Sequence, residues 1–465
     1  MLVRFLSFGL IALGSLGASG CTRYIAKPLA PGTIATKQAD RAFDAEKVAA
    51  RLTLLAPSQH FETVRWDRLA LFSAMIENNS DIAAARAGLL RAIAEERAAR
   101  APAGPTLTLT TEYAGAAPEA SPWLFGGAID IPLDIGGRRA ARLDSAGLKT
   151  AIARYDFLEA VWTARQALRT AMVDRLIAVR KAETGSQLTA LRDRHFAAVS
   201  RRVAAGETTR ADLERIRADL GDARRRAADA AIRVVAETRT IAALTGVPVS
   251  ELSDSRVNWD GFDSPISNAP NPATRRAALV ARADILRVVA AYDQSEADLR
   301  GEVARQYPAI SVGPGFTWER GLVKLPFSIG LVLPPLDLNR RAIAAAEARR
   351  TEAGSRLEAA VSNATTAIDA AETEALAARE GLAAIRRNEL PAAARLAAQA
   401  DRELRAGAID RTDWAASQSG ALVARLSELD ALARVYAADT ALELALRRPL
   451  AGPELNIVGT PGALQ

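Results

Sequence analysis

The chain offers few side chains for covalent, redox or metal chemistry. Cys21 is its only cysteine, and His60 and His195 are its only histidines among 465 residues. One cysteine excludes a disulfide framework and any site built from several thiolates, and two separated histidines leave little scope for imidazole chemistry. The sequence has no nucleophile elbow, phosphate-binding glycine loop or metal-ligand spacing. We therefore expect no enzymatic activity, no metal site and no cofactor, with both histidines on ordinary surfaces.

Cys21 has a different chemistry, which its position indicates. Residues 1–20 begin with a basic region at Arg4, continue through an apolar run and end in small residues, as signal peptides do. The small residues 18–20 before Cys21 resemble a bacterial lipobox, so we expect cleavage there and a covalent lipid such as palmitate on the cysteine. Thr22, in place of Asp, indicates sorting to the outer membrane. An ordinary signal peptide with a bystander cysteine is the alternative.

The composition favours long helices in a folded protein. Hydrophobic residues make up 49% of the chain and aromatic residues 5%, and long stretches rich in Ala, Arg, Leu and Glu lack proline. The net charge of +6 is a mild bias, so we expect no nucleic-acid partner. No apolar stretch after Cys21 has the length of a transmembrane helix, so any membrane crossing would have to be made by strands.

Blocks of sequence recur about 200 positions apart, which indicates an internal duplication. The pairs are 81–82 with 284–285 and 131–134 with 334–337, at a spacing of 203, and 138–140 with 340–342, at a spacing of 202. The spacing falls from 203 to 202 because the two residues Gly136-Gly137 correspond to the single residue Asn339. Proline near these blocks excludes helix, so chance similarity between Ala- and Arg-rich helices does not explain them. We expect one structural unit used twice, over 66–270 and 271–448.

Each half has the order helix, strand, strand, very long helix, turn, helix. Residues 140–204 carry apolar residues at spacings of three and four, which predicts one helix of about 100 Å. Residues 340–405 repeat this pattern, and Pro391 should kink that helix without ending it. The chain should reverse at Gly206 and Gly407, and helices this long need coiled-coil partners. The two predicted helical hairpins span about 138–245 and 340–447.

Four segments alternate between apolar and polar residues. We expect strands at about 105–114, 122–133, 308–319 and 323–333. In the first of them, Leu107 and Leu109 flank Thr108, so one face is apolar and the other polar. The lengths suit tilted membrane strands, although soluble hairpins packed on the helices would show the same alternation. Pro314 and Pro326 should lie at bulges or edges.

Four membrane strands would require several copies of the chain. An open sheet edge in lipid leaves backbone N–H and C=O groups unpaired, and single-chain membrane barrels begin at eight strands. Two copies would give eight strands, whose side chains fill the interior, whereas three copies give twelve and leave a channel. We therefore predict a homotrimer. Its fold class is mainly α-helical, with a shared 12-stranded membrane β-barrel and a long α-helical barrel.

Taken together, these features resemble the TolC-like outer-membrane efflux factor family, in its lipoprotein branch, over nearly the whole mature chain. The residues that carry the resemblance are Cys21, the paired blocks 81–86 and 284–287, the strand-to-helix junctions 132–139 and 335–341, and residues 244–248. The resemblance implies a trimeric exit duct, lipid-anchored in the outer membrane and extending into the periplasm. It also implies two partners, a periplasmic adaptor and an inner-membrane RND-type transporter.

The family resemblance further implies a periplasmic gate. In the family, an acidic residue three positions after the second turn glycine projects into the closed mouth, and Asp410 stands at that position here. A ring of three carboxylates would favour the passage of cations, and repulsion within the ring would raise the pKa values of the carboxyl groups. The alternative is that Asp410 is the N-cap of the returning helix. Asp413, with Arg405 and Arg411, could form the ion pairs that keep this tip shut.

The two turn glycines are candidate docking points. In the family, adaptor hairpins meet the duct at these turns, here Gly206 and Gly407, where a missing side chain allows close approach. A plain C-cap role is the alternative. A duct for type I protein secretion shares the same features, whereas a lipidated adaptor would have one hairpin only. Residues 21–65 are expected as an irregular lipidated segment and 449–465 as a loose tail.

Overall fold

The computed structural model describes residues 22–55, 66–115, 121–253, 257–259, 272–319 and 321–451. The predicted signal peptide, Cys21, His60 and most of the expected tail lie outside these residues. The chain divides into two units, 1–42 and 43–465. In the first unit, an extended segment leads into the exposed helix α2 (Pro31–Ala39). All other described elements belong to the second unit.

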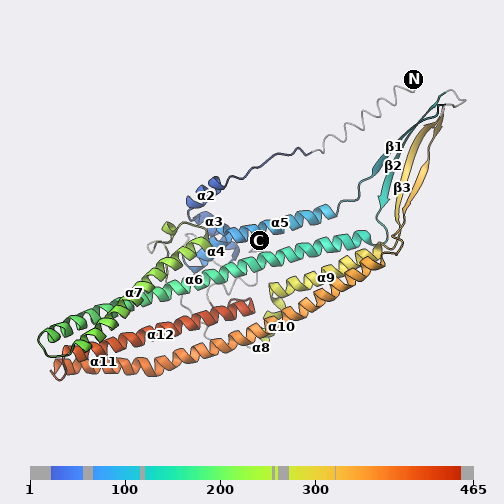
Figure 1. Ribbon diagram of the computed structural model, residues 1–465. Helices are drawn as coiled ribbons and strands as arrows, with labels where there is room; N and C mark the ends of the chain where they lie inside the picture. The colour runs from blue at the N-terminus through green and yellow to red at the C-terminus, as the bar shows by residue number, and fades with distance from the viewer. Residues whose placement is uncertain are drawn as a thin grey trace. The chain divides into compact units, whose positions relative to one another are not determined.

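The second unit is mainly helical, as expected, and repeats one order of elements (Figure 1). Its first half contains α3 (Ala45–Leu55), α4 (Arg68–Asn78), α5 (Ser80–Ala99), β1 (Thr106–Tyr113), β2 (Trp123–Leu133), α6 (Arg138–Ala204), α7 (Arg210–Thr245) and the short helix η2 (Val249–Leu252). Its second half contains α8 (Pro272–Ala281), α9 (Ala283–Ala304), β3 (Ala309–Glu319), β4 (Leu322–Lys324), β5 (Phe327–Val332), α10 (Arg340–Ala384), η3 (Ile385–Glu389), α11 (Leu390–Arg405) and α12 (Arg411–Leu446).

The strands form one antiparallel sheet at one end of α6 and α10, and the turns that end the hairpins lie at the opposite end (Figure 1). β2 pairs with β1 and β3, so the central pairing joins the two halves. The segment expected as one strand, 323–333, is divided into β4 and β5. Pro326 lies between them because it has no N–H for a ladder, and its carbonyl accepts a 2.7 Å bond from Gly315.

The apolar side chains of the sheet are exposed in this chain. Leu109 is 75% exposed and Phe327 67%. Neighbouring aromatic rings contact one another along the surface, with ring centroids 4.8 Å apart for Tyr113 and Trp123. These exposures do not fit the alternative in which the apolar face packs on the chain's own helices. Among the described helices, none is long and apolar enough to cross a membrane.

Two clusters of buried residues hold the helices together. The first lies where α4 and α5 meet α6 and α7, around Leu71, Phe157 and Ile241. The second lies among α6, α10 and α12, around Ile368 and Leu442. Small residues bring the long helices close, since a Cβ added at Gly185 of α6 would lie 3.2 Å from Ala227 of α7.

The two strand-to-helix junctions and Pro391 show local adjustments. Pro391 follows a π-helical turn, η3, which accommodates the missing N–H so that the helix continues as α11. Both junctions hold two successive residues at positive φ, which corrects the expectation that Gly136-Gly137 shrank to Asn339. The equivalent pair is Leu338 and Asn339, at 52° and 60°, so the missing position lies before it.

Candidate functional site at the hairpin tips

Each helical hairpin ends at a glycine in the left-handed conformation. Gly206 has φ +77° and Gly407 has φ +70°. The amide after each glycine donates back across the last turn, from Glu207 to the Arg202 carbonyl at 2.9 Å and from Ala408 to the Glu403 carbonyl at 2.8 Å. Both glycines therefore have the C-cap role. A Cβ added to either one would meet no described atom within 4 Å, so the turns are also open to close approach.

Asp410 is the N-cap of α12. Its Oδ1 accepts hydrogen bonds from the backbone N–H groups of Thr412 at 2.8 Å and Asp413 at 2.9 Å. Thr209 takes the same place in the first hairpin, where its hydroxyl accepts from the Asp212 amide at 3.1 Å. Asp410 therefore has the N-cap role that was the alternative to a gate, and its Oδ2 remains available for another contact.

That second oxygen joins the two hairpins. Arg202, in the last turn of α6, places Nη1 2.7 Å from Asp410 Oδ2, and its Nε lies 3.5 Å from Glu207. Backbone N–H donation from Asp413 and Thr412 holds the pKa of Asp410 below its usual value, and the charged side chain of Arg202 lowers it further. In a single chain this direction is opposite to the rise expected for a ring of three carboxylates.

The other predicted gate residues do not pair with one another within the chain. Arg405 Nε donates to the backbone carbonyl of Asp401 in its own helix at 3.0 Å. No ion pair among the described residues joins Asp413 to Arg405 or Arg411. Asp401 joins α11 to α12 instead, because its carboxylate accepts a hydrogen bond from Trp414 Nε1 at 2.6 Å.

His195 lies closer to the tip acids than its predicted surface position suggests. It is half-buried on α6, and its Nε2 has no hydrogen-bond partner among the described atoms. Burial and the charge of Arg215 lower the pKa of His195, while Asp410 and Asp219 act in the opposite direction. The neutral imidazole is therefore favoured near the tip.

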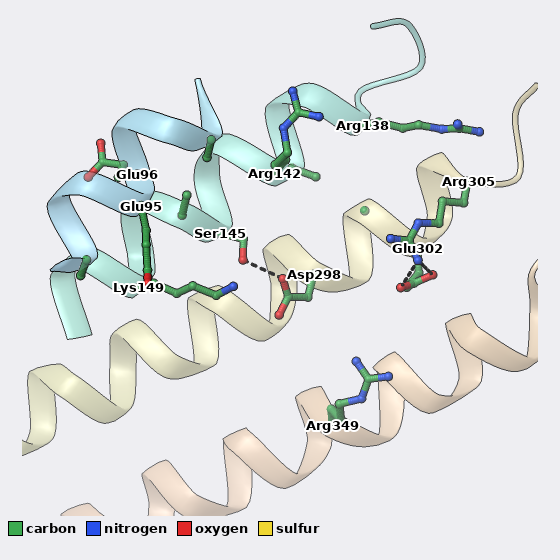
Figure 2. Close-up of a pocket in the computed structure, with 15 residues that line it drawn as sticks. Glu95, Glu96, Arg138, Arg142, Ser145, Lys149, Asp298, Glu302, Arg305 and Arg349 are labelled. Carbon is green, nitrogen blue, oxygen red and sulfur yellow. Dashed lines mark hydrogen bonds and ion pairs between the residues drawn. The ribbon is translucent and has the colours of Figure 1, made fainter. Parts of the chain in front are cut away.

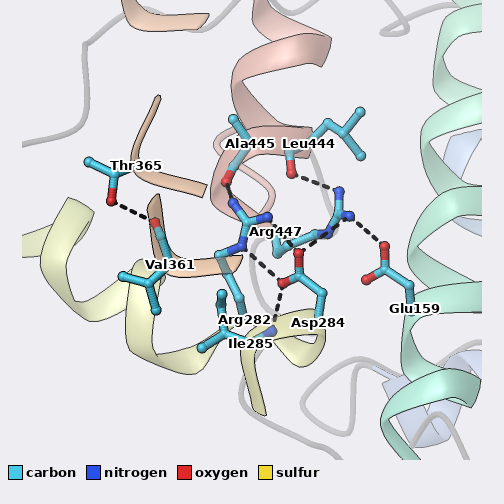
Figure 3. Close-up of polar contacts among 9 residues, drawn as sticks. All are labelled: Glu159, Arg282, Asp284, Ile285, Val361, Thr365, Leu444, Ala445 and Arg447. Carbon is cyan, nitrogen blue, oxygen red and sulfur yellow. Dashed lines mark hydrogen bonds and ion pairs between the residues drawn. The ribbon is translucent and has the colours of Figure 1, made fainter. Parts of the chain in front are cut away.

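A second polar cluster lies where α12 ends and α9 begins (Figure 3). Arg282 donates to the Ala445 carbonyl and pairs with Asp284 at 2.7 Å. Arg447 ends α12 at φ +49° and pairs with Glu159 of α6. Burial raises the pKa of Glu159. The cluster therefore fixes α6, α9 and α12 to one another.

The first repeat contains the same junction in a simpler form. Asn79, at the position equivalent to Arg282, donates to the Leu244 carbonyl at 3.0 Å. Gly246 ends α7 at φ +68°, two residues later, as Arg447 follows Ala445. A Cβ at Gly246 would lie 2.6 Å from the Asn78 carbonyl oxygen, so only glycine fits there.

A buried ion cluster connects the two repeats further along α6. Glu443 of α12 is fully buried and contacts Arg165 at 3.0 Å and also Arg169. Burial opposes ionisation of Glu443, but these two guanidiniums outweigh it and lower the pKa of the carboxyl. The Leu450 amide adds a 2.7 Å hydrogen bond. This charge is held by partners and is not exposed to a ligand.

A polar cavity of about 530 Å³ lies among α5, α6 and α9 near the strands. Figure 2 shows its lining of mixed acids and bases, with Ser145 donating to Asp298 at 2.8 Å. Arg305 at its strand end is held by Glu302 at 2.9 Å. We assign this cavity no catalytic role.

Sequence reasoning missed Arg202 and the buried cluster. The family resemblance pointed to Asp410, because its distance from the turn glycine is a local feature that can be matched in the sequence. Arg202 stands in the other hairpin, and the only available signal was its place in the basic last turn of α6. Glu443 resembles any surface acid of an Ala-rich helix until α6 is placed beside it.

Comparison with known proteins points in one direction. Residues 71–247, which include β1, β2, α6 and α7, match the family described as outer membrane efflux protein. The cobalt-zinc-cadmium resistance protein CzcC of Cupriavidus metallidurans is 24% identical over 215 residues, which are 44% of this chain and 48% of CzcC. The chain therefore matches about half the length of that relative.

Solved structures share the fold over more of the chain. The CmeC outer membrane channel of Campylobacter jejuni has a TM-score of 0.67 at 12% identity, covering 96% of this chain and 98% of CmeC. The open state of the MtrE outer membrane channel of Neisseria gonorrhoeae has a TM-score of 0.62 at 16% identity, covering 80% and 88%. At these identities the similarity establishes the fold.

Proposed function

We propose, since residues 71–247 belong to the outer membrane efflux protein family, that this chain forms the outer-membrane exit duct of a tripartite efflux pump. Small molecules would pass from an inner-membrane RND-type transporter and a periplasmic adaptor through this duct to the exterior. The observation that carries the proposal is the sheet, which exposes its apolar side chains and is continuous with two long helical hairpins.

The proposed duct is a homotrimer with a 12-stranded barrel and a helical barrel. Among the described strands of one chain, β1 pairs only with β2, and β4 and β5 pair only with β3, so this part of the sheet has two edges. An edge in hydrocarbon leaves backbone groups unpaired at a cost of several kcal/mol each. Joining the edges of three copies would remove this cost and leave a channel.

The proposed gate lies at the hairpin tips. Three copies of Asp410 would surround one axis, each held by its cap bonds and by Arg202 of the same chain. This arrangement supports cation preference and ties the two hairpins of one chain together at the closed mouth. Asp413, Arg405 and Arg411 could then pair only between copies.

Two further features complete the proposal. The adaptor would dock on the turns at Gly206 and Gly407, where an added side chain meets open space. Acylation of Cys21 would anchor the N-terminus in the outer membrane, and the lipid is the only covalent addition we propose. Substrate choice would lie mostly with the transporter.

Planar-bilayer conductance tests this function. The full-length chain, purified in detergent and added to a bilayer, should give discrete channels that pass cations in preference to anions. A chain that associates with bilayers but never conducts, under any voltage or salt applied, would contradict the duct. A duct for protein secretion would give the same conductance, but it would also export a polypeptide.

A further inference from the structure

The second strand-to-helix junction contains a strained, exposed leucine. Gly136 and Gly137 take positive φ in the first junction, where glycine is unstrained. In the second junction the same place is taken by Leu338 at φ 52° and Asn339 at φ 60°. A left-handed conformation is sterically unfavourable for leucine. The chain therefore holds a bulky apolar residue where glycine would fold more easily.

The fold fixes this turn but does not bury the leucine. Asn339 Nδ2 donates to the backbone carbonyl and to the carboxylate of Glu302, both at 2.9 Å, which attaches the turn to the end of α9. Leu338 nevertheless stays 46% exposed, and Leu336 is fully exposed. Packing within this chain therefore does not account for either leucine.

Two free arginines follow the turn. Arg340 and Arg341 are both exposed, and neither has an ion-pair partner among the described residues. They occupy the first turn of α10, which contains no acid and where the helix dipole disfavours cations. The pair therefore does not serve the stability of its own helix.

The corresponding arginines of the first junction are engaged in the fold. Arg138 Nε donates to the Ala304 carbonyl at 3.2 Å. Arg139 donates to the Arg100 carbonyl at 3.3 Å and lies 3.7 Å from Asp134. Only the second junction thus combines exposed leucines with unpaired guanidiniums.

We propose that Leu336, Leu338, Arg340 and Arg341 form an interfacial anchor that binds the headgroups of anionic phospholipids. This rests on the proposed function, because it takes the sheet to lie in the membrane. Along the chain, the exposed apolar residues of β5, such as Leu331, are followed by the exposed Leu336 and then by the arginine pair. Leucines would enter the acyl boundary while the guanidiniums bind phosphate oxygens in two-point contacts.

Native mass spectrometry of the full-length protein tests the anchor. The detergent-purified chain is incubated with an equimolar mixture of phosphatidylglycerol and phosphatidylcholine, and retained lipids are counted. We expect preferential retention of phosphatidylglycerol. Arg340→Gln with Arg341→Gln should weaken that retention about 25-fold, because each arginine near an anionic surface contributes roughly fivefold. Phosphatidylcholine retention should not change.

The matched control removes two exposed charges from the same helical course far from the strands. Arg387→Gln with Arg395→Gln should leave phosphatidylglycerol retention unchanged. Equal retention in the junction variant, or an equal loss in the control, overturns the anchor. Leu338→Asn should also weaken retention without lowering the unfolding temperature, because asparagine tolerates positive φ. A lowered unfolding temperature would show that Leu338 packs in the fold and would overturn its role.

The same protein separates this proposal from the one on which it rests. Insertion of the unaltered chain into phosphatidylcholine vesicles, measured by flotation, supports the proposed function independently of headgroup charge. Insertion without preference for phosphatidylglycerol contradicts the anchor alone. Failure to insert at all contradicts the membrane duct and the anchor with it.

Discussion

Arg202 of the first hairpin and Asp410 of the second form an ion pair, with Nη1 and Oδ2 2.7 Å apart, across the tips of one chain. The same carboxylate caps α12 through its other oxygen. One residue thus sets the start of a helix and the distance between two hairpins. These two roles can be separated experimentally, because a cap requires only an acceptor whereas the pair requires charge.

Asp410→Asn should keep much of the cap and remove the charge. We expect reduced cation selectivity in bilayers with little change in unfolding temperature. Asp410→Ala should lose both properties and destabilise the fold by about 1 kcal/mol. Thr209→Ala, which removes a neutral cap in the first hairpin, is the control and should leave selectivity unchanged. Unaltered selectivity in Asp410→Asn would remove this residue from the gate.

The Arg202–Asp410 pair should respond to salt more than to mild acid. The pKa of Asp410 is lowered in the folded chain, so the stability it contributes is present above the unfolded value of about 3.9 and is lost only below it. Opening in bilayers should therefore not change between about pH 8 and pH 5, while molar salt should increase it by screening. An opening transition near pH 6 would show that repulsion within a ring dominates instead.

Arg202→Gln should increase opening at neutral pH. Because this exposed pair contributes no more than about 1 kcal/mol, the global unfolding temperature should hardly change. Arg201→Gln, which removes a neighbouring charge in the same turn, is the control for net charge. Opening that rises equally in both variants would indicate a general charge effect and not the pair.

Gly206 at the first hairpin turn and Gly246 at the end of α7 should differ sharply in their tolerance of a methyl group. Gly206→Ala meets only backbone strain, since nothing lies within 4 Å, and should cost about 1 kcal/mol. Gly246→Ala adds a Cβ 2.6 Å from the Asn78 carbonyl oxygen and should cost about 3 kcal/mol or more. Chemical unfolding of the detergent-purified chain gives both values, and equal costs would contradict the close approach at Gly246.

Glu443→Gln should be strongly destabilising. The change leaves Arg165 and Arg169 buried without this carboxylate, at a cost of about 3–5 kcal/mol. Because the pKa of Glu443 is lowered, its stabilising effect should be lost only below about pH 4.3. Glu207→Gln, at an exposed pair, is the control and should cost less than about 1 kcal/mol.

The sequence predicted features that depend on neighbouring residues. The turns at Gly206 and Gly407 followed from helix periodicity and from the conformational freedom of glycine. The segment 323–333 was predicted as one strand with Pro326 at a bulge or edge, and it is instead divided there. The mainly helical fold with one sheet followed from proline-free stretches and from alternation. Each of these depends on a few consecutive positions.

Features that join distant segments could not be predicted. Arg202 and Asp410 are 208 positions apart, and Glu443 becomes a buried ion only when α6 lies beside α12. Leu338 was hidden by the alignment of the repeats, which placed the missing residue inside the turn. Backbone conformation, and not residue similarity, identified the position where leucine replaced glycine.

We propose that sister copies complete the sheet of this chain. The mass of the protein particle in detergent tests this most directly. Native mass spectrometry, or light scattering corrected for detergent, should give three copies of the mature chain in one particle. A folded single copy that remains in aqueous solution without detergent would contradict the account.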